Sequence, residues 1–273
     1  MLVKTQNKKI LFIGDIVANP GRRVLEKNLR RLQDEYCIDF TVANGENSSG
    51  GFGMSKSAFD ELCAIGIDAF TMGNHTWDKK ELATFIDKET NIVRPLNFSD
   101  CQHGVGFRVF QLGEQRLALI NMIGQIFMQP ADCPFAAADK LLAELSLQME
   151  QQGETINYII VDMHAEATSE KMAMGWYLDG RVSAVLGTHT HVQTNDARLL
   201  PKGTAYITDV GMTGPHDSIL GMDPDLVLRR FLAKRSSKLQ PAAGDLQINA
   251  VVLELLTNGR AANIKTINLI DPA

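Results

Sequence analysis

The stretch KILFIG, residues 9–14, is a short apolar run that ends in a glycine and is followed at once by Asp15. Such a run is typical of a buried strand. Two similar runs, DFTVAN (39–44) and IDAFTMG (67–73), follow along the chain, and helical patterns separate them. Strands that alternate with helices predict a parallel sheet covered on both sides, and therefore an α/β fold.

The remaining patterns extend this prediction along the chain. Helices are expected over about 21–36, 55–66 with Ser55 as N-cap, 78–89 and 134–153. Further strands are expected at 157–164, 182–191 and 203–211, with hairpins over 104–124 and 250–270. Because no repeat or low-complexity linker interrupts the chain, residues 1–273 are expected to form a single domain with a large core.

Polar side chains follow the apolar runs at the points where the predicted strands end. In an open α/β sheet, ligands bind outside the carboxyl ends of the strands. Each polar motif alone is also compatible with a turn or a helix cap, and a lone histidine with a core position. Their recurrence at successive strand ends instead indicates a metal site. The residues are Asp15, Glu46, Asn47, Asn74, His75, His164, His189 and His191.

Two of the histidines stand two residues apart in GTHTH (187–191), directly behind the apolar run VSAVL (182–186). On a strand, residues i and i+2 point to the same face, so His189 and His191 would direct two imidazoles at one point. The pair favours a metal, although a pair alone does not establish one.

The types of donor indicate which metals would bind. Carboxylate, amide and imidazole donors without a thiolate suit manganese, iron or zinc in five- or six-coordinate sites. The donors outnumber the four ligands of one tetrahedral zinc. Two ions are therefore expected, with a carboxylate such as Glu46 between them, and a pair of metals about 3.5–4 Å apart is the clamp used in phosphoester displacement.

Composition argues against several classes of partner and compartment. The net charge is −5, so the basic face that long nucleic acids require is not expected. The four cysteines are scattered singly, which predicts reduced, mostly buried thiols rather than a disulfide framework. The first apolar run is too short for a signal peptide, and no segment approaches the roughly 18 apolar residues of a membrane span. A cytoplasmic protein without membrane attachment is expected.

The strand-end motifs resemble the calcineurin-like metallophosphoesterase superfamily. The shared features are GD at 14–15, GNH at 73–75, the strand-end His164 and GTHTH at 187–191. Longer motifs are similar to those of its YmdB-like bacterial subfamily, through essentially the whole chain. They are ANGENSSGGFGM (43–54), TMGNHTWDKKEL (71–82), VDMHAEATSEKMAMGWYLDGRVSAVLGTHTHVQT (161–194) and YITDVGMTGPHDSILGMD (206–223).

The resemblance implies a layered α/β/β/α fold, with mixed sheets flanked by helices, and a site with two divalent metal ions. Asn74, His164 and His189 would lie around one ion. Asp15 and His191 would lie around the other, and Glu46 would bridge the two. The implied metal ligands are Asp15, Glu46, Asn47, Asn74, His164, His189 and His191.

Two positions depart from the superfamily pattern, although both departures are usual in the subfamily. Val17 stands where the superfamily has a histidine, and Glu46 stands where it has an aspartate. Both bear on the identity of the metals. Manganese or iron is expected, with zinc and magnesium as alternatives.

Members of the subfamily hydrolyse phosphodiesters, including cyclic nucleotides. The resemblance implies attack by a metal-activated hydroxide on a 2′,3′- or 3′,5′-cyclic nucleotide, with His75 as the acid that protonates the leaving oxygen. The alternative for His75 is a structural role in orienting Asn74. Phosphomonoesterases and nucleases for short oligonucleotides could use the same centre. A non-catalytic regulatory protein could retain the fold, but the full ligand set argues against it. A homo-oligomer is compatible with the sequence.

Overall fold

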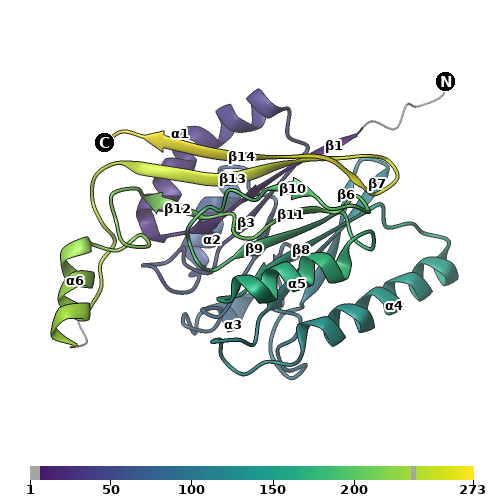
Figure 1. Cartoon of the computed structure of the whole chain (residues 1–273), viewed down its shortest axis with the longest axis horizontal. Coiled ribbons are helices and arrows are strands. Elements are labelled where there is room, and N and C mark those ends of the chain that lie inside the picture. The colour runs from purple at the N-terminus through teal and green to yellow at the C-terminus, as the bar shows by residue number, and fades with distance from the viewer. Residues whose placement is uncertain (1–6, 235–237) are drawn as a thin grey trace.

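The computed structural model describes residues 7–234 and 238–273, which form two β-sheets with helices on their outer faces (Figure 1). The first sheet has the strand order β2-β12-β13-β1-β3-β4-β5, and β14 pairs with β13 beside this path. Within it, β1, β3, β4 and β5 run parallel, whereas β13 is antiparallel to β1. Its strands are β1 (Lys8–Ile13), β2 (Asp15–Ile16), β3 (Phe40–Asn44), β4 (Ala69–Thr71), β5 (Ile92–Val93), β12 (Met212–Pro215), β13 (Leu246–Leu255) and β14 (Ala261–Asp271).

The second sheet has the strand order β10-β11-β9-β8-β7-β6. The strands β7, β8, β9 and β11 run parallel, and a hairpin adds β6 at one edge. Its strands are β6 (Phe107–Leu112), β7 (Gln115–Ile123), β8 (Tyr158–His164), β9 (Ala184–Thr188), β10 (Arg198–Leu199) and β11 (Ala205–Ile207).

Helices cover one face of each sheet. The helices α1, α2 and α3 pack on the first sheet, and α4 and α5 pack on the second. The short helix α6 lies to one side and contacts the body through Val227, which packs with Val17 and Met212 (Figure 1). The helices are α1 (Ala18–Tyr36), α2 (Lys56–Ala64), α3 (Leu82–Phe85), α4 (Pro134–Gln152), α5 (Thr168–Leu178) and α6 (Pro224–Ala233).

The alternation of side chains along the strands explains why there are four layers. In β1, Ile10 and Phe12 point to a core between the two sheets, whereas Leu11 and Ile13 point to the core under α1 and α2. Successive side chains of a strand face opposite sides of its sheet, so one apolar run supplies both cores. The second sheet divides its side chains in the same way between the central core and the core under α4 and α5. The α/β/β/α fold that the resemblance implies is therefore confirmed.

Several expectations drawn from the sequence are wrong in detail. Neither sheet is covered by helices on both faces, because the inner face of each packs against the other sheet. The helix expected over 78–89 contains only the four residues of α3. The strand expected over 182–191 ends at Thr188, and the strand expected over 203–211 is limited to β11. The N-cap at Ser55 is confirmed, because its hydroxyl accepts a hydrogen bond from the backbone N–H of Ala58 at 3.3 Å.

The cysteines and the helices bear on two further expectations. The four cysteines are free thiols as expected, but Cys37, Cys101 and Cys133 are exposed and Cys63 is half-buried, so the expectation that they are mostly buried is wrong. None of the helices in residues 7–234 and 238–273 combines the length and apolar character needed to cross a membrane.

Candidate metal centre

The strand ends of both sheets meet at one edge of the molecule and carry the polar residues there. Asp15 begins β2 and is separated from β1 by one glycine, Glu46 and Asn47 follow β3, and Asn74 follows β4. From the second sheet, His164 is the last residue of β8, and His189 and His191 follow β9. All seven ligands implied by the resemblance are therefore brought to the same region, as the contacts among them show.

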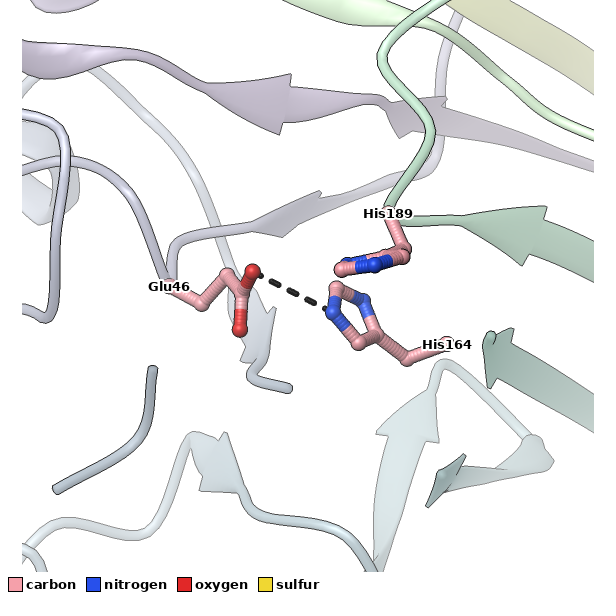
Figure 2. A group of neighbouring side chains, drawn as sticks. All are labelled: Glu46, His164 and His189. Atoms are coloured by element: carbon pink, nitrogen blue, oxygen red, sulfur yellow. Dashed lines mark ion pairs between the residues drawn. The ribbon is translucent and has the colours of Figure 1, made fainter. Parts of the chain in front are cut away.

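The first group of donors surrounds His164, whose side chain is fully buried. Its Nε2 lies 2.9 Å from Oδ1 of Asn74 and 3.2 Å from Oε1 of Glu46. The ring of His189 lies beside it, with centroids 4.8 Å apart. Glu46, His164 and His189 each offer one donor atom within 4.8 Å of the others, and their side chains converge from the two sheets (Figure 2).

The second group of donors surrounds Asp15, which is also fully buried. Its Oδ1 lies 3.7 Å from Nε2 of His191, and that nitrogen lies 3.2 Å from Nδ2 of Asn47. Asn47 also contacts Oε1 of Glu46 at 3.2 Å, so Glu46 stands between the two groups. Two buried oxygens, Oδ1 of Asp15 and Oδ1 of Asn47, have no hydrogen-bond partner.

His75 lies at the margin of the donors rather than among them. Its backbone N–H donates to Oε2 of Glu46 at 2.9 Å, which fixes the start of the loop after β4. Its Nδ1 lies 2.7 Å from Oδ2 of Asp78, and 27% of its side chain is exposed. Because Asp78 occupies Nδ1, the other ring nitrogen is free to face a ligand. The sequence alone did not single out Asp78.

Burial and mutual attraction shift the pKa values of the donors strongly. Burial alone would raise the pKa of Glu46, but the neighbouring His164 outweighs it and lowers that pKa to about 2. Burial would likewise lower the pKa of His164, yet Glu46 and Asp15 raise it to about 9. For His189, burial and the charge of His164 both act in one direction and lower its pKa to about 3. Without bound metal, a proton on His164 therefore balances the negative charge of Glu46, and His189 is neutral.

A chain of hydrogen bonds behind His164 sets its tautomer. The Nδ1 of His164 lies 2.9 Å from the Thr188 hydroxyl, which donates to Oδ1 of Asp162 at 2.6 Å. Because a carboxylate can only accept, the Thr188 hydroxyl must donate its one proton to Asp162. The hydroxyl oxygen must then accept a hydrogen bond from Nδ1–H of His164. In neutral His164, the form that binds a metal, the lone pair therefore lies on Nε2, which faces Asn74 and Glu46.

The same chain connects the two sheets. The other oxygen of Asp162 accepts from Nδ2 of Asn44 at 3.1 Å, and Oδ1 of Asn44 accepts from the backbone N–H of Glu46 at 3.1 Å. Sequence reasoning missed Asn44, Asp162 and Thr188. A signal was available for Asp162, because it lies two residues before His164 and so shares its face of β8.

The two histidines after β9 are not on a strand, which corrects the geometry expected for the GTHTH motif. His189 has φ 96° and His191 has φ 64°, so both adopt the left-handed conformation in a turn. A buried ion pair holds this turn. Asp209 accepts from Lys171 at 2.7 Å and from the backbone N–H of Thr190 at 3.0 Å. The turn, and not strand alternation, sets the directions of the two imidazoles, so that of His189 lies beside His164 and that of His191 lies beside Asp15.

Glu166 lies beside the first group and was also missed from the sequence. Its Oε2 lies 3.1 Å from Nε2 of His189, and half of its side chain is exposed. It follows β8 by two residues, so it is a further carboxylate delivered by the same strand end.

A glycine keeps the space among the donors open. A Cβ at Gly73 would lie 2.3 Å from Nε2 of His164 and 2.4 Å from Oε2 of Glu46. Only glycine leaves room for both groups at this position, which explains the glycine in the GNH motif.

The residues present fit divalent cations on three grounds. The two buried carboxylates, Asp15 and Glu46, are connected through contacts with His191 and Asn47, and such carboxylate, imidazole and amide donors suit hard or borderline metals. The unpartnered oxygens of Asp15 and Asn47 lack the bonds that buried polar atoms normally make. Neutral His164 would present its lone pair into the same space, with its tautomer fixed from behind as in metal-ligating histidines.

Comparisons with known proteins show the family and the fold of the chain. The family model described as YmdB-like protein matches residues 11–267. The 2′,3′-cyclic-nucleotide 2′-phosphodiesterase of Bacillus subtilis is 49% identical over 247 residues, which is 90% of this chain and 91% of that protein. A crystal structure of a hypothetical protein from Thermus thermophilus has a TM-score of 0.89 and 43% identity, and covers 97% of this chain and 100% of that one. A Mycoplasma pneumoniae structure described as a novel phosphatase has a TM-score of 0.90 and 32% identity, with 97% and 94% covered.

Proposed function

The chain belongs to the YmdB-like protein family, and from this membership we propose that it is a metal-dependent phosphodiesterase that hydrolyses 2′,3′-cyclic nucleotides. The observation that carries the proposal is the convergence of carboxylate, amide and imidazole donors from both sheets around Glu46 and His164. The relative named as a 2′,3′-cyclic-nucleotide 2′-phosphodiesterase, at 49% identity, supports this choice of substrate over 3′,5′-cyclic nucleotides.

Two divalent cations, manganese or iron in the first place, are the proposed cofactors. Asn74, His164 and His189 would hold one, while Asp15, Asn47 and His191 would hold the other. Glu46 would contribute to both, since it contacts each group. Bound there, such ions supply positive charge for the phosphate oxygens and make water more acidic.

The protein's own part in the reaction centres on His75. The cyclic diester opens when water attacks phosphorus and a ribose oxygen leaves, and that oxygen needs a proton. Asp78 holds Nδ1 of His75 and the backbone N–H of His75 is fixed by Glu46, so the imidazolium form of His75 would give the leaving oxygen the proton on its other ring nitrogen. With the 2′ oxygen as the leaving group, the product is a 3′-nucleotide.

His75→Ala tests the acid role separately from the metal site. Because His75 lies at the margin of the donors, we expect bound metal to stay at the level of the unchanged protein. Turnover should fall by about 10²- to 10⁴-fold, the usual contribution of a positioned acid. Unchanged turnover would remove the acid role, and lost metal would make His75 a ligand.

The activity itself is tested with metal-stripped protein. We expect Mn²⁺ to restore hydrolysis of bis(p-nitrophenyl) phosphate and of 2′,3′-cyclic AMP, with 3′-AMP as the product of the latter. Hydrolysis of p-nitrophenyl phosphate but of neither diester would favour a phosphomonoesterase. No hydrolysis of any of the three with Mn²⁺ bound would favour a non-catalytic protein.

A further inference from the structure

An aromatic side chain stands at the rim of the centre beside the proposed acid. The ring centroid of Phe52 lies 5.0 Å from that of His75, and the two planes meet edge to face at 71°. Phe52 is nevertheless 40% exposed, so its packing on His75 leaves much of the ring open to solvent. A large apolar side chain in this position can contact a ligand that reaches His75.

The glycine-rich loop after Glu46 fixes where this ring stands. Gly51 and Gly53, on either side of Phe52, have φ values of 93° and 73°. A Cβ at Gly51 would lie 2.4 Å from the end of Met222, and one at Gly53 would lie 2.8 Å from the backbone nitrogen of Lys79. The loop is therefore packed closely on both flanks, against the segment before α6 and against the loop that carries His75.

The loop is also closed at its base. The backbone N–H of Ser49 donates to the carbonyl of Gly53 at 3.0 Å, and the Ser49 hydroxyl contacts the Ser55 hydroxyl at 2.9 Å. These bonds bring the two ends of the loop together. Phe52 lies within the closed loop, and the closely packed Gly51 and Gly53 on either side fix its position.

The chemistry of a cyclic diester determines which part of the substrate lies near Phe52. The acid must stand at the leaving oxygen, and in a 2′,3′-cyclic nucleotide that oxygen stays attached to the ribose that bears the base. The nucleoside therefore extends on the His75 side of the phosphate. Resting on the proposed function, we propose that Phe52 forms the base-binding subsite, on which the nucleobase stacks.

Stacking on a phenyl ring accepts any base, because every base has a π-face. We therefore expect the enzyme to accept substrates with any base. The contact with the base should strengthen substrate binding and so lower KM. Stacking should lower KM more for purine nucleotides than for pyrimidine nucleotides, because purines have the larger ring system.

The test compares Phe52→Ala and Phe52→Tyr on two substrates. One is 2′,3′-cyclic AMP. The other is methyl ribofuranoside 2,3-cyclic phosphate, which keeps the ribose and the cyclic phosphate but lacks the base. For Phe52→Ala we expect kcat/KM on cyclic AMP to fall by about 10- to 100-fold through KM, with the riboside unchanged. Phe52→Tyr should retain both activities. Bound Mn²⁺ and the melting temperature are measured for each variant to show that the centre and the fold are intact.

The outcomes separate this subsite from the proposed function. If the unchanged protein hydrolyses both substrates with equal kcat/KM, the phosphodiesterase stands and the subsite is overturned. If Phe52→Ala loses activity equally on both, Phe52 positions His75 and does not bind the base. If Phe52→Ala changes neither activity, the ring has no role in binding. If the unchanged protein hydrolyses neither substrate, the proposed function and the subsite fall together.

Discussion

Replacing Thr188 with valine should weaken metal binding without touching a metal ligand. The Thr188 hydroxyl lies 2.9 Å from Nδ1 of His164 and donates to Asp162 at 2.6 Å, and the three side chains are fully buried. Valine keeps the branched shape but cannot bond to either neighbour. His164 is then free to carry its proton on Nε2, where it blocks a cation.

The size of the effect follows from the two lost bonds. An unpaired buried polar group costs about 1–3 kcal/mol, and Asp162 keeps its bond from Asn44, so the free energy of unfolding should fall by about 2–4 kcal/mol. Loss of the group that orients a ligating histidine typically weakens metal affinity about 10- to 100-fold. That corresponds to about 1.4–2.7 kcal/mol of binding free energy.

Two control variants make the measurement decisive. Thr188→Ser keeps the hydroxyl and should bind Mn²⁺ almost as tightly as the unchanged protein. Thr204→Val removes another fully buried hydroxyl, which donates to the carbonyl of Val182 near the start of β9. It should lower stability but not metal affinity. Mn²⁺ affinity is measured by competition with a chelator, and stability by urea unfolding of the metal-free protein. Equal Mn²⁺ affinity in Thr188→Val and the unchanged protein would refute the reasoning.

Three further changes test the centre. In the folded metal-free protein the pKa of His164 is raised to about 9. The proton on His164 therefore stabilises the folded protein by about 3 kcal/mol below about pH 6.5, and this stabilisation is lost as the pH rises through 9. Between pH 6.5 and 9.5, the urea midpoint of the metal-free protein should therefore fall more than the urea midpoint of His164→Asn. An equal fall in the two proteins would contradict the raised pKa. Gly73→Ala should abolish Mn²⁺ binding, because the new Cβ would lie 2.3 Å from Nε2 of His164. The control is Gly45→Ala, whose Cβ would meet only flexible or apolar side-chain atoms of Met54 and Phe70 and which should still bind Mn²⁺. Tight Mn²⁺ binding by Gly73→Ala would contradict this prediction. Lys171→Met leaves the buried Asp209 without its cation and should lower the free energy of unfolding by about 3–5 kcal/mol, measured in urea. An unchanged urea midpoint would show that the ion pair does not hold the turn.

The longer strands were predictable because each is an apolar run bounded by turn residues, whereas the short β2, β5, β10 and β12 were not. Their packing into two sheets followed from the family resemblance and not from the pattern of residues. In β1 every residue from Ile10 to Ile13 is fully buried, so the sequence shows no polar side. An apolar run of this kind does not distinguish a helix from a second sheet as the covering layer. Only the assignment of Ile10 and Phe12 to the central core, with Leu11 and Ile13 under the helices, makes that distinction.

Much of the site was predictable for a related reason. Carboxyl ends of parallel strands meet at one edge, so residues as distant as Asp15 and His191 could be expected to be neighbours. The residues behind the donors could not be found in this way. Asn44 and Thr188 end their strands as ordinary polar residues, and their contacts depend on how the two sheets are placed. The left-handed turn at His189 likewise depends on Asp209, which is far away in the sequence.

The most direct test of the account is a titration of metal-stripped protein with Mn²⁺, in which bound metal and hydrolysis of 2′,3′-cyclic AMP are measured in the same samples. We predict that hydrolysis is absent at the start, appears as the sites fill, and reaches its maximum with two ions bound per chain. Saturation with two ions without hydrolysis, or full hydrolysis by the stripped protein, would contradict the central claim that these strand-end donors form a metal-dependent phosphodiesterase centre.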